Sequence, residues 1–380
     1  MRSLLYILIF SIIVPGIIFS VNATGISENS ITIEGRIVDS ERGRPLVGVH
    51  VFLSETTIGT VTDDDGRYEL SKVSPGAYRI YISKLGYENI AEDKMLSASV
   101  DTLDYKMKPE DVELEEVTVE DKADEDWQRN FRRFKNEFIG TSERADSVEI
   151  INREVLNFDR NWWGRLTAEA AEPLRIKNYS LGYKITYHLD EFTTTGTTTK
   201  WDGEPLFEEM TPADSQQKEK WEIEREEAFL GSFRHFLLSL INGEISSEGF
   251  IMYIHNRDAR GNYSQDKRRE RRSRLINYDN EEEAYKMNFF GKLEIIYTKG
   301  EETRRYRDWL RDHNRSHSRS QTSYLELNER PLTIDEEGEI LETYGATRYG
   351  FFAFRRLADV NPREYRPDGM EEVFPLTDAE

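Results

Sequence analysis

Apolar and polar side chains alternate in short runs over the first third of the chain. Residues 47–53 and 78–82 place an apolar side chain at every second position, and a period of two predicts strands that bury one face. Glycine and proline separate these runs at intervals of roughly ten residues, which is typical of an antiparallel sandwich. The pattern therefore predicts an all-β sandwich over residues 31–108, with about seven strands.

The stretch TVTDDDGRYEL at residues 60–70 places three adjacent aspartates before a glycine. A calcium loop of the EF-hand type needs acidic ligands at alternate positions and a glutamate six residues after its glycine, where this chain has Lys72. A tight hairpin fits better, because Asp63 can accept backbone N–H groups and Gly66 can supply a positive φ. We therefore expect Asp63 and Gly66 to form a structural turn.

The apolar spacing changes to that of helices after an acidic linker predicted at residues 109–126. Trp127, Phe131, Phe134 and Phe138 recur every three or four residues, which predicts a helix with one face in a core. A second, long helix is predicted over residues 215–242. Its first half is acidic, which suits a helix N-terminus, and its second half carries an apolar stripe.

Strand patterns occur between and after these helices. Residues 183–189 alternate, with His188 on the polar face. Further strands are predicted at residues 147–151, 165–176, 249–255, 285–290, 292–299, 324–328 and 339–343. Residues 127–370 thus predict an α+β domain with an antiparallel sheet and two main helices, followed by an acidic tail at 371–380.

The first 23 residues have the features of a secretory signal peptide. Arg2 precedes a nearly continuous apolar run, and small residues follow at Val21 and Ala23, where a signal peptidase would cleave. An uncleaved membrane anchor is the alternative, since the run is about long enough to span a bilayer. We expect cleavage, no later transmembrane span, and a location in the periplasm or at the outer membrane.

The overall charge narrows the classes of partner. The chain has 380 residues, no cysteine and a formal net charge of −21. Such acidity argues against general binding to nucleic acids or anionic membranes, and the lack of cysteine excludes disulfides and thiolate chemistry. A basic run at residues 266–274 is expected to be solvated or to pair with the acidic helix.

A signature rich in glycine, proline, aspartate and tyrosine residues is spread over the predicted sandwich. It consists of Gly35, Val38, Asp39, Pro45, Gly48, Gly59, Thr60, Thr62, Asp63, Gly66, Tyr68, Pro75, Gly76, Tyr78, Gly86 and Tyr87. This signature resembles the carboxypeptidase regulatory-like family of Bacteroidetes-type bacteria. The resemblance implies a transthyretin-like or starch-binding-like β-sandwich, joined here to a C-terminal domain that resembles uncharacterised envelope proteins.

In outer-membrane receptors that carry this module, a segment resembling Leu114–Val119 contacts the energy-coupling protein TonB. A receptor also needs a plug and a large barrel, for which the remainder of this chain is too short. We therefore expect Leu114–Val119 to reflect shared ancestry or a linker strand rather than a TonB contact.

The family name prompts a search for a zinc peptidase site. His188 and Glu191 match a short His-x-x-Glu motif, and His313 could be the distant third ligand. The surroundings typical of that peptidase family are absent, and a chain so rich in glutamate produces such motifs by chance. We expect no catalytic residues, metal or cofactor.

Three functions remain open from the sequence. The leading hypothesis is a non-enzymatic cell-envelope protein that binds a protein or glycan partner. The alternatives are a metal-dependent hydrolase using His188, Glu191 and His313, and a carbohydrate-binding accessory protein whose sandwich binds sugar, by analogy with starch-binding-like folds.

Overall fold

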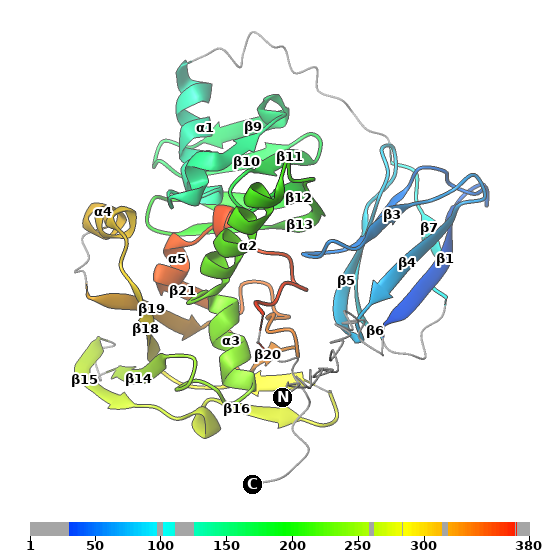
Figure 1. Cartoon of the computed structure of the whole chain (residues 1–380). Coiled ribbons are helices and arrows are strands. Elements are labelled where there is room, and N and C mark those ends of the chain that lie inside the picture. Colours follow the sequence, from blue (N-terminus) through cyan, green and yellow to red (C-terminus); the bar gives the residue numbers. More distant parts are fainter. Residues whose placement is uncertain are drawn as a thin grey trace, which may run out of the picture.

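The computed structural model describes residues 30–96, 102–110, 125–257, 262–282, 284–313, 318–368 and 370. They form a small sandwich beside a larger α+β domain (Figure 1), so the predicted fold class is confirmed. The predicted signal peptide (1–23), Leu114–Val119 and the predicted tail (371–380) lie outside the described residues, and the predicted linker is described only at its ends. Within the described residues, no helix has the length and apolarity needed to cross a membrane.

The sandwich consists of two sheets with the strand orders β4-β1-β7 and β3-β2-β5-β6. β1 is antiparallel to β4 and parallel to β7. Side chains between the sheets, such as Ile33, Val51 and Ile80, are almost fully buried. The strands are Ile31–Asp39 (β1), His50–Leu53 (β2), Gly59–Val61 (β3), Arg67–Val73 (β4), Gly76–Ser83 (β5), Ile90–Leu96 (β6) and Tyr105–Met107 (β7).

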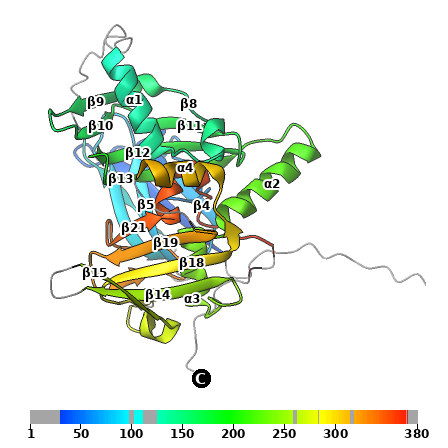
Figure 2. The same ribbon diagram turned by 90° about the vertical axis from the view of Figure 1, so that its left-hand side faces the viewer.

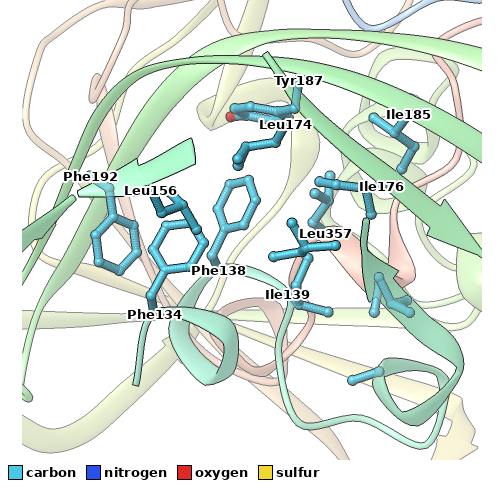
Figure 3. Close-up of a cluster of buried hydrophobic side chains, with 14 of the residues drawn as sticks. Phe134, Phe138, Ile139, Leu156, Leu174, Ile176, Ile185, Tyr187, Phe192 and Leu357 are labelled. Carbon is cyan, nitrogen blue, oxygen red and sulfur yellow. The ribbon is translucent and has the colours of Figure 1, made fainter. Parts of the chain in front are cut away.

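A six-stranded sheet with the order β8-β11-β12-β10-β9, in which β13 also pairs with β12, begins the larger domain. The predicted aromatic helix is α1 (Glu125–Phe138), and its stripe packs into the core (Figure 3). There, Phe134 meets Phe192 edge to face, and Phe138 meets Tyr187 in the same way. The strands are Val148–Ile150 (β8), Leu156–Arg160 (β9), Leu166–Ala170 (β10), Leu174–Asn178 (β11), Tyr183–Thr194 (β12) and Thr199–Glu209 (β13).

Two further antiparallel sheets complete this domain, with the orders β15-β14-β18-β19-β21 and β16-β17-β20. They share one core with helix α3 (Phe233–Ile241), which precedes β14 and in which Leu237 and Leu240 pack near Phe250 and Ile295. The elements are Phe250–Arg257 (β14), Tyr263–Arg269 (β15), Ile276–Asp279 (β16), Ala284–Met287 (β17), Lys292–Glu301 (β18), Arg304–Asp312 (α4), Ser320–Leu327 (β19), Leu332–Ile334 (β20), Ala346–Gly350 (β21) and Phe351–Phe354 (α5).

The long helix predicted at 215–242 is wrong, because it divides into α2 (Ser215–Phe229) and α3 (Phe233–Ile241). Gly231 breaks it with a φ of 69°, and a Cβ there would lie 2.6 Å from the ring of Tyr297. Ser232 then caps α3 by accepting a hydrogen bond from the N–H of His235 at 3.0 Å. Figure 2 shows α2 extending outward from the body of the domain.

Several predicted strands also need correction. The strand expected at 165–176 is two strands, β10 and β11, separated by a bend. Residues 339–343 form an isolated bridge at Ile340 rather than a strand. The basic run at 266–274 includes most of β15, an edge strand whose polar residues give no alternating signal.

Candidate functional site

The sandwich buries the outer face of its β3-β2-β5-β6 sheet against the larger domain. Phe52 on β2 and Tyr81 on β5 point away from the sandwich core, yet they are only 1% and 3% exposed. His188 on β12 lies against both rings, with centroids 5.6 Å from Phe52 and 4.8 Å from Tyr81. Burial, with a smaller contribution from His50, lowers the pKa of His188 to about 4. His188 is therefore a neutral aromatic part of the interface at neutral pH.

The loop between β2 and β3 binds the larger domain through main-chain hydrogen bonds. The N–H of Glu55 donates to the carbonyl of Pro205 at 2.7 Å, and the N–H of Phe207 donates to Thr56 at 2.9 Å. Arg363 donates its N–H to the carbonyl of Glu55 at 2.7 Å. Glu55 has a φ of 65°, a conformation that costs a residue with a side chain on the order of 1 kcal/mol and persists only where surroundings hold it.

A buried carboxylate forms an ion pair across the same interface. Glu204 on β13 is 3% exposed, and its Oε1 lies 3.1 Å from the guanidinium of Arg79 on β5. Arg79 also pairs with Asp93 at 2.8 Å. Burial raises the pKa of Glu204, while Ser54 and Arg79 oppose that effect. Because an unpaired buried charge is costly, this pair favours one docked arrangement of the domains.

A cleft of about 530 Å³ lies where the two domains meet, a volume within the range of small-molecule sites. Its walls combine aromatic rings with charged groups of both signs. The sandwich contributes Glu55, Tyr78, Arg79, Asp93 and Lys94, and the larger domain contributes Trp201, Asp202, Glu204, Phe233, Glu339, Glu342, Tyr344, Arg348 and Arg363.

Besides Glu204, two further carboxyl groups in the cleft have raised pKa values. Burial raises the pKa of Glu55, although Arg363 and Arg234 oppose the shift. Burial and the nearby Glu55 raise the pKa of Glu339 to about 8, even though Arg234 lies 3.5 Å away. Raised carboxyl pKa values beside a strained backbone in a cleft are typical of functional sites.

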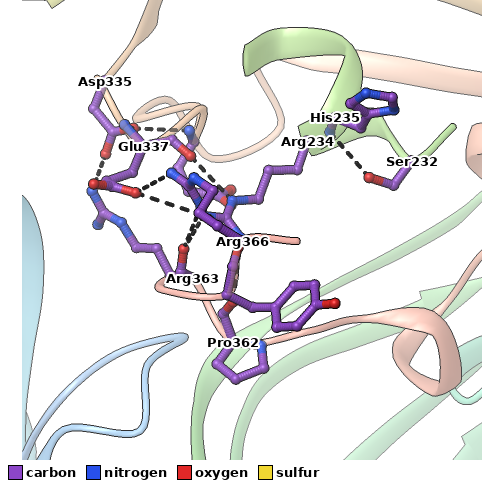
Figure 4. Close-up of polar contacts among 10 residues, drawn as sticks. Ser232, Arg234, His235, Asp335, Glu337, Pro362, Arg363 and Arg366 are labelled. Atoms are coloured by element: carbon purple, nitrogen blue, oxygen red, sulfur yellow. Dashed lines mark hydrogen bonds and ion pairs between the residues drawn. The ribbon is translucent and has the colours of Figure 1, made fainter. Parts of the chain in front are cut away.

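A network of arginines and carboxylates supports one wall of the cleft (Figure 4). Arg363 pairs with Asp335, which also accepts the N–H groups of Glu337 and Glu339 at 2.9 Å each. Arg234 on α3 donates to the carbonyl of Glu337 at 3.1 Å. The carboxylate-rich turn after β20 is thus tied to α3 and to the C-terminal segment, which positions Glu339 at the cleft.

The structure does not bring together the three residues of the hydrolase alternative. His188 packs at the interface, whereas Glu191 accepts a hydrogen bond from the hydroxyl of Tyr344 at 2.9 Å. His313 ends α4, with its ring 4.1 Å from that of Trp309. Across the described ranges, no group of three or more His, Asp or Glu side chains is arranged to hold a metal ion.

Asp63 and Gly66 lie in the turn between β3 and β4. One oxygen of Asp63 accepts the N–H groups of Asp65 at 2.9 Å and Arg67 at 2.8 Å. Gly66 has a φ of 72°, and a Cβ there would lie 2.5 Å from the carbonyl oxygen of Ile37. The carboxylate of Asp63 is therefore engaged by the main chain of its own turn.

The cleft could not be predicted from the sequence, because its walls come from distant segments of the chain. One signal was present: residues 51–53 (VFL) and 80–82 (IYI) are continuously apolar within otherwise alternating strands. A strand with no polar side is buried on both faces, so the sandwich needed a partner on its second face. The sequence does not say which segment covers it.

Comparison with known proteins identifies the sandwich. Residues 33–119 match the CarboxypepD_reg-like domain, which confirms the resemblance for this part of the chain. TonB-dependent receptor SusC of Bacteroides thetaiotaomicron is 36% identical over 76 residues, which are 20% of this chain and 7% of the receptor. The chain therefore spans a small fraction of that relative's length.

Among solved structures, a cohesin–X-dockerin complex from Acetivibrio cellulolyticus is 27% identical over 20% of this chain and 51% of its own chain, with a TM-score of 0.17. A candidate carbohydrate binding protein from Bacteroides uniformis is 12% identical over 47% of this chain and 78% of its own, with a TM-score of 0.18. These TM-scores are too low to support an inference about this chain.

Proposed function

We propose that this is an exported cell-envelope protein that binds a glycan in the cleft between its two domains and catalyses no reaction on it. The cleft itself is the observation that carries the proposal. It is formed by both domains, and the interface around it is fastened by main-chain hydrogen bonds and by the Arg79–Glu204 ion pair.

The chemistry of the cleft walls supports a ligand rich in hydroxyl groups. Trp201 and Tyr344 offer aromatic rings beside the carboxylates of Asp202 and Glu342, and Arg348 adds hydrogen-bond donors. Sugar hydroxyls both donate and accept hydrogen bonds, while the apolar face of a sugar ring can pack on an aromatic side chain. Since cations and carboxylates both line the cleft, a neutral saccharide fits it better than a strongly charged ligand.

Export is supported by the signal-peptide features of residues 1–23. The receptor that shares the module is named as TonB-dependent, which is consistent with a place in the bacterial envelope. Binding without turnover is supported by Arg234, which lies 3.5 Å from Glu339 and donates to the carbonyl of Glu337, because these contacts make Glu339 part of a structural network.

The proposal is tested by titrating the full chain without residues 1–23 with a panel of neutral polysaccharides, using isothermal titration calorimetry. We expect at least one glycan to bind. Glu55→Gln and Tyr344→Phe should each weaken that binding about fivefold or more, since the first replaces a carboxyl group of the cleft with an amide and the second removes a hydroxyl group, both at nearly constant shape.

Tyr179, which follows β11, and Glu149 on β8 provide matched controls, because neither residue lines the cleft. Tyr179 is 48% exposed and its hydroxyl lies 3.5 Å from Glu149, so Tyr179→Phe and Glu149→Gln make the same chemical changes outside the cleft. Both should leave glycan binding unchanged. Failure of the whole panel to bind, equal losses in the controls, or turnover of a glycan abolished by Glu55→Gln would contradict the proposal.

A further inference from the structure

Two adjacent tryptophans stand on the surface at the tip of the hairpin formed by β9 and β10. Trp162 is 80% exposed and Trp163 is 75% exposed. By contrast, Trp221 on α2 is 5% exposed. Large aromatic side chains dominate interface energetics when they become buried, so a pair left in solvent on one tip indicates a surface that meets something else.

The turn that carries these tryptophans is held firmly. Asn161 accepts the N–H of Arg165 at 2.9 Å through its side chain, and its main-chain N–H donates to the carbonyl of Arg165 at 3.1 Å. Gly164 has a φ of 83° and donates its N–H to Asn161 at 3.0 Å. Arg133 of α1 donates to the carbonyl of Gly164 at 2.7 Å. The tip is thus pre-organised, which lowers the entropic cost of binding.

The charge around the tip differs in sign from that of the whole protein. Arg160 and Arg165 flank the tryptophans and are exposed, and the half-buried Arg133 of α1 adds a third cation through its hydrogen bond to Gly164. Asp159 is the nearest carboxylate along the hairpin. The chain as a whole carries a net charge of −21, so an anionic surface would repel most of the molecule and admit this corner.

We propose that the β9–β10 tip docks onto an anionic lipid bilayer surface. Tryptophan is enriched at the level of lipid headgroups, where its apolar ring and polar N–H are both accommodated. Arginines beside it gain electrostatic attraction from anionic lipids. A short hairpin tip is suited to this partner because it can insert two rings into the interface while the sheet behind it stays in water.

A sugar chain fits this tip less well than a bilayer. The two indole rings lie against each other at a tilt, with centroids 3.4 Å apart and planes at 33°, so they form one apolar projection rather than a flat platform for a sugar ring. The side-chain oxygen of Asn161 is engaged by the turn. A glycan site needs open ring faces flanked by free polar groups, whereas insertion into lipid headgroups needs neither.

The test measures co-sedimentation of the full chain without residues 1–23 with vesicles of phosphatidylcholine that contain one third phosphatidylglycerol. We expect binding at low salt, a blue shift of tryptophan fluorescence on binding, and weaker binding as salt is added. Trp162→Ala combined with Trp163→Ala should reduce the partition coefficient about tenfold or more. Vesicles of pure phosphatidylcholine should bind at least several-fold more weakly.

Phe290→Ala is the matched control, because Phe290 is another exposed aromatic side chain, 70% exposed, that follows β17 on a different sheet. It should leave vesicle binding unchanged, and circular dichroism should show that all variants keep the fold. The proposal is overturned if the protein does not bind, if binding survives the double substitution, or if neutral vesicles bind equally well. Retention by a polysaccharide through the two tryptophans, without vesicle binding, would also overturn it.

Discussion

Glu339 illustrates how burial in the cleft changes the chemistry of a single side chain. Its carboxyl pKa rises from 4.5 to about 8, first through burial and then through Glu55. The folded protein therefore holds a proton on Glu339 at pH values where the unfolded chain has released it. The stability contributed by that proton is fully present below pH 4.5 and is lost as the pH rises through about 8.

Replacing Glu339 with glutamine should expose this dependence on pH. Glutamine stays neutral, so the melting temperatures of wild type and Glu339→Gln should agree near pH 4 and then separate, with the variant becoming more stable until the difference levels off above pH 8. The Glu339 side chain is 31% exposed. We therefore expect the difference in free energy of unfolding between the two proteins to level off on the order of 1–2 kcal/mol. Thermal melts of both proteins from pH 4 to pH 9 measure this difference. A stability difference that does not change with pH would refute the raised pKa of Glu339.

Asp63 supports a second prediction at the residue scale. Asp63→Ala removes the acceptor for two main-chain N–H groups and should lower the free energy of unfolding by about 1 kcal/mol. Calcium should leave the melting temperature of both proteins unchanged. Asp64→Ala, at the exposed neighbouring position, is the control and should cost less. Stabilisation by calcium that disappears in Asp63→Ala would instead indicate a metal loop.

At the scale of elements, the break between α2 and α3 depends on one glycine. Gly231→Ala places a Cβ 2.6 Å from Tyr297 at a φ of 69°, and we expect a loss of about 2 kcal/mol or more. Gly43→Ala is the matched control, since Gly43 has a φ of 62° and nothing within 4 Å of an added Cβ. Urea denaturation should show a smaller loss for Gly43→Ala; equal losses would mean that the close approach to Tyr297 contributes nothing.

Element prediction succeeded where local chemistry decides the structure. The aromatic spacing from Trp127 to Phe138 predicted α1, and the alternation at residues 183–189 predicted β12. It failed where distant contacts decide. The sequence around Gly231 is compatible with one long helix, and the contact with Tyr297 that breaks the helix comes from a distant strand. Likewise, β15 is an edge strand whose charged residues show no apolar alternation.

At the scale of the whole molecule, the docking of the sandwich could not be predicted from the sequence. Glu55 and Glu339 are far apart in the chain and line one cleft only because the β2–β3 loop pairs with β13 and Arg363. The continuous apolar run at residues 51–53 indicated that a second face would be buried. Which segment packs on that face depends on long-range contacts, here those of His188 with Phe52 and Tyr81.

Docking therefore makes the sandwich one wall of the cleft, and the proposed function requires that a glycan binds there. Hydrogen–deuterium exchange of the full chain without residues 1–23, with and without the tightest-binding neutral glycan of the panel, tests it most directly. We predict that the glycan slows exchange at residues 54–55, 201–204, 339–346 and 348, which line the cleft from both domains. Protection confined to the β4-β1-β7 sheet, with the cleft segments unchanged, would contradict glycan binding in the cleft.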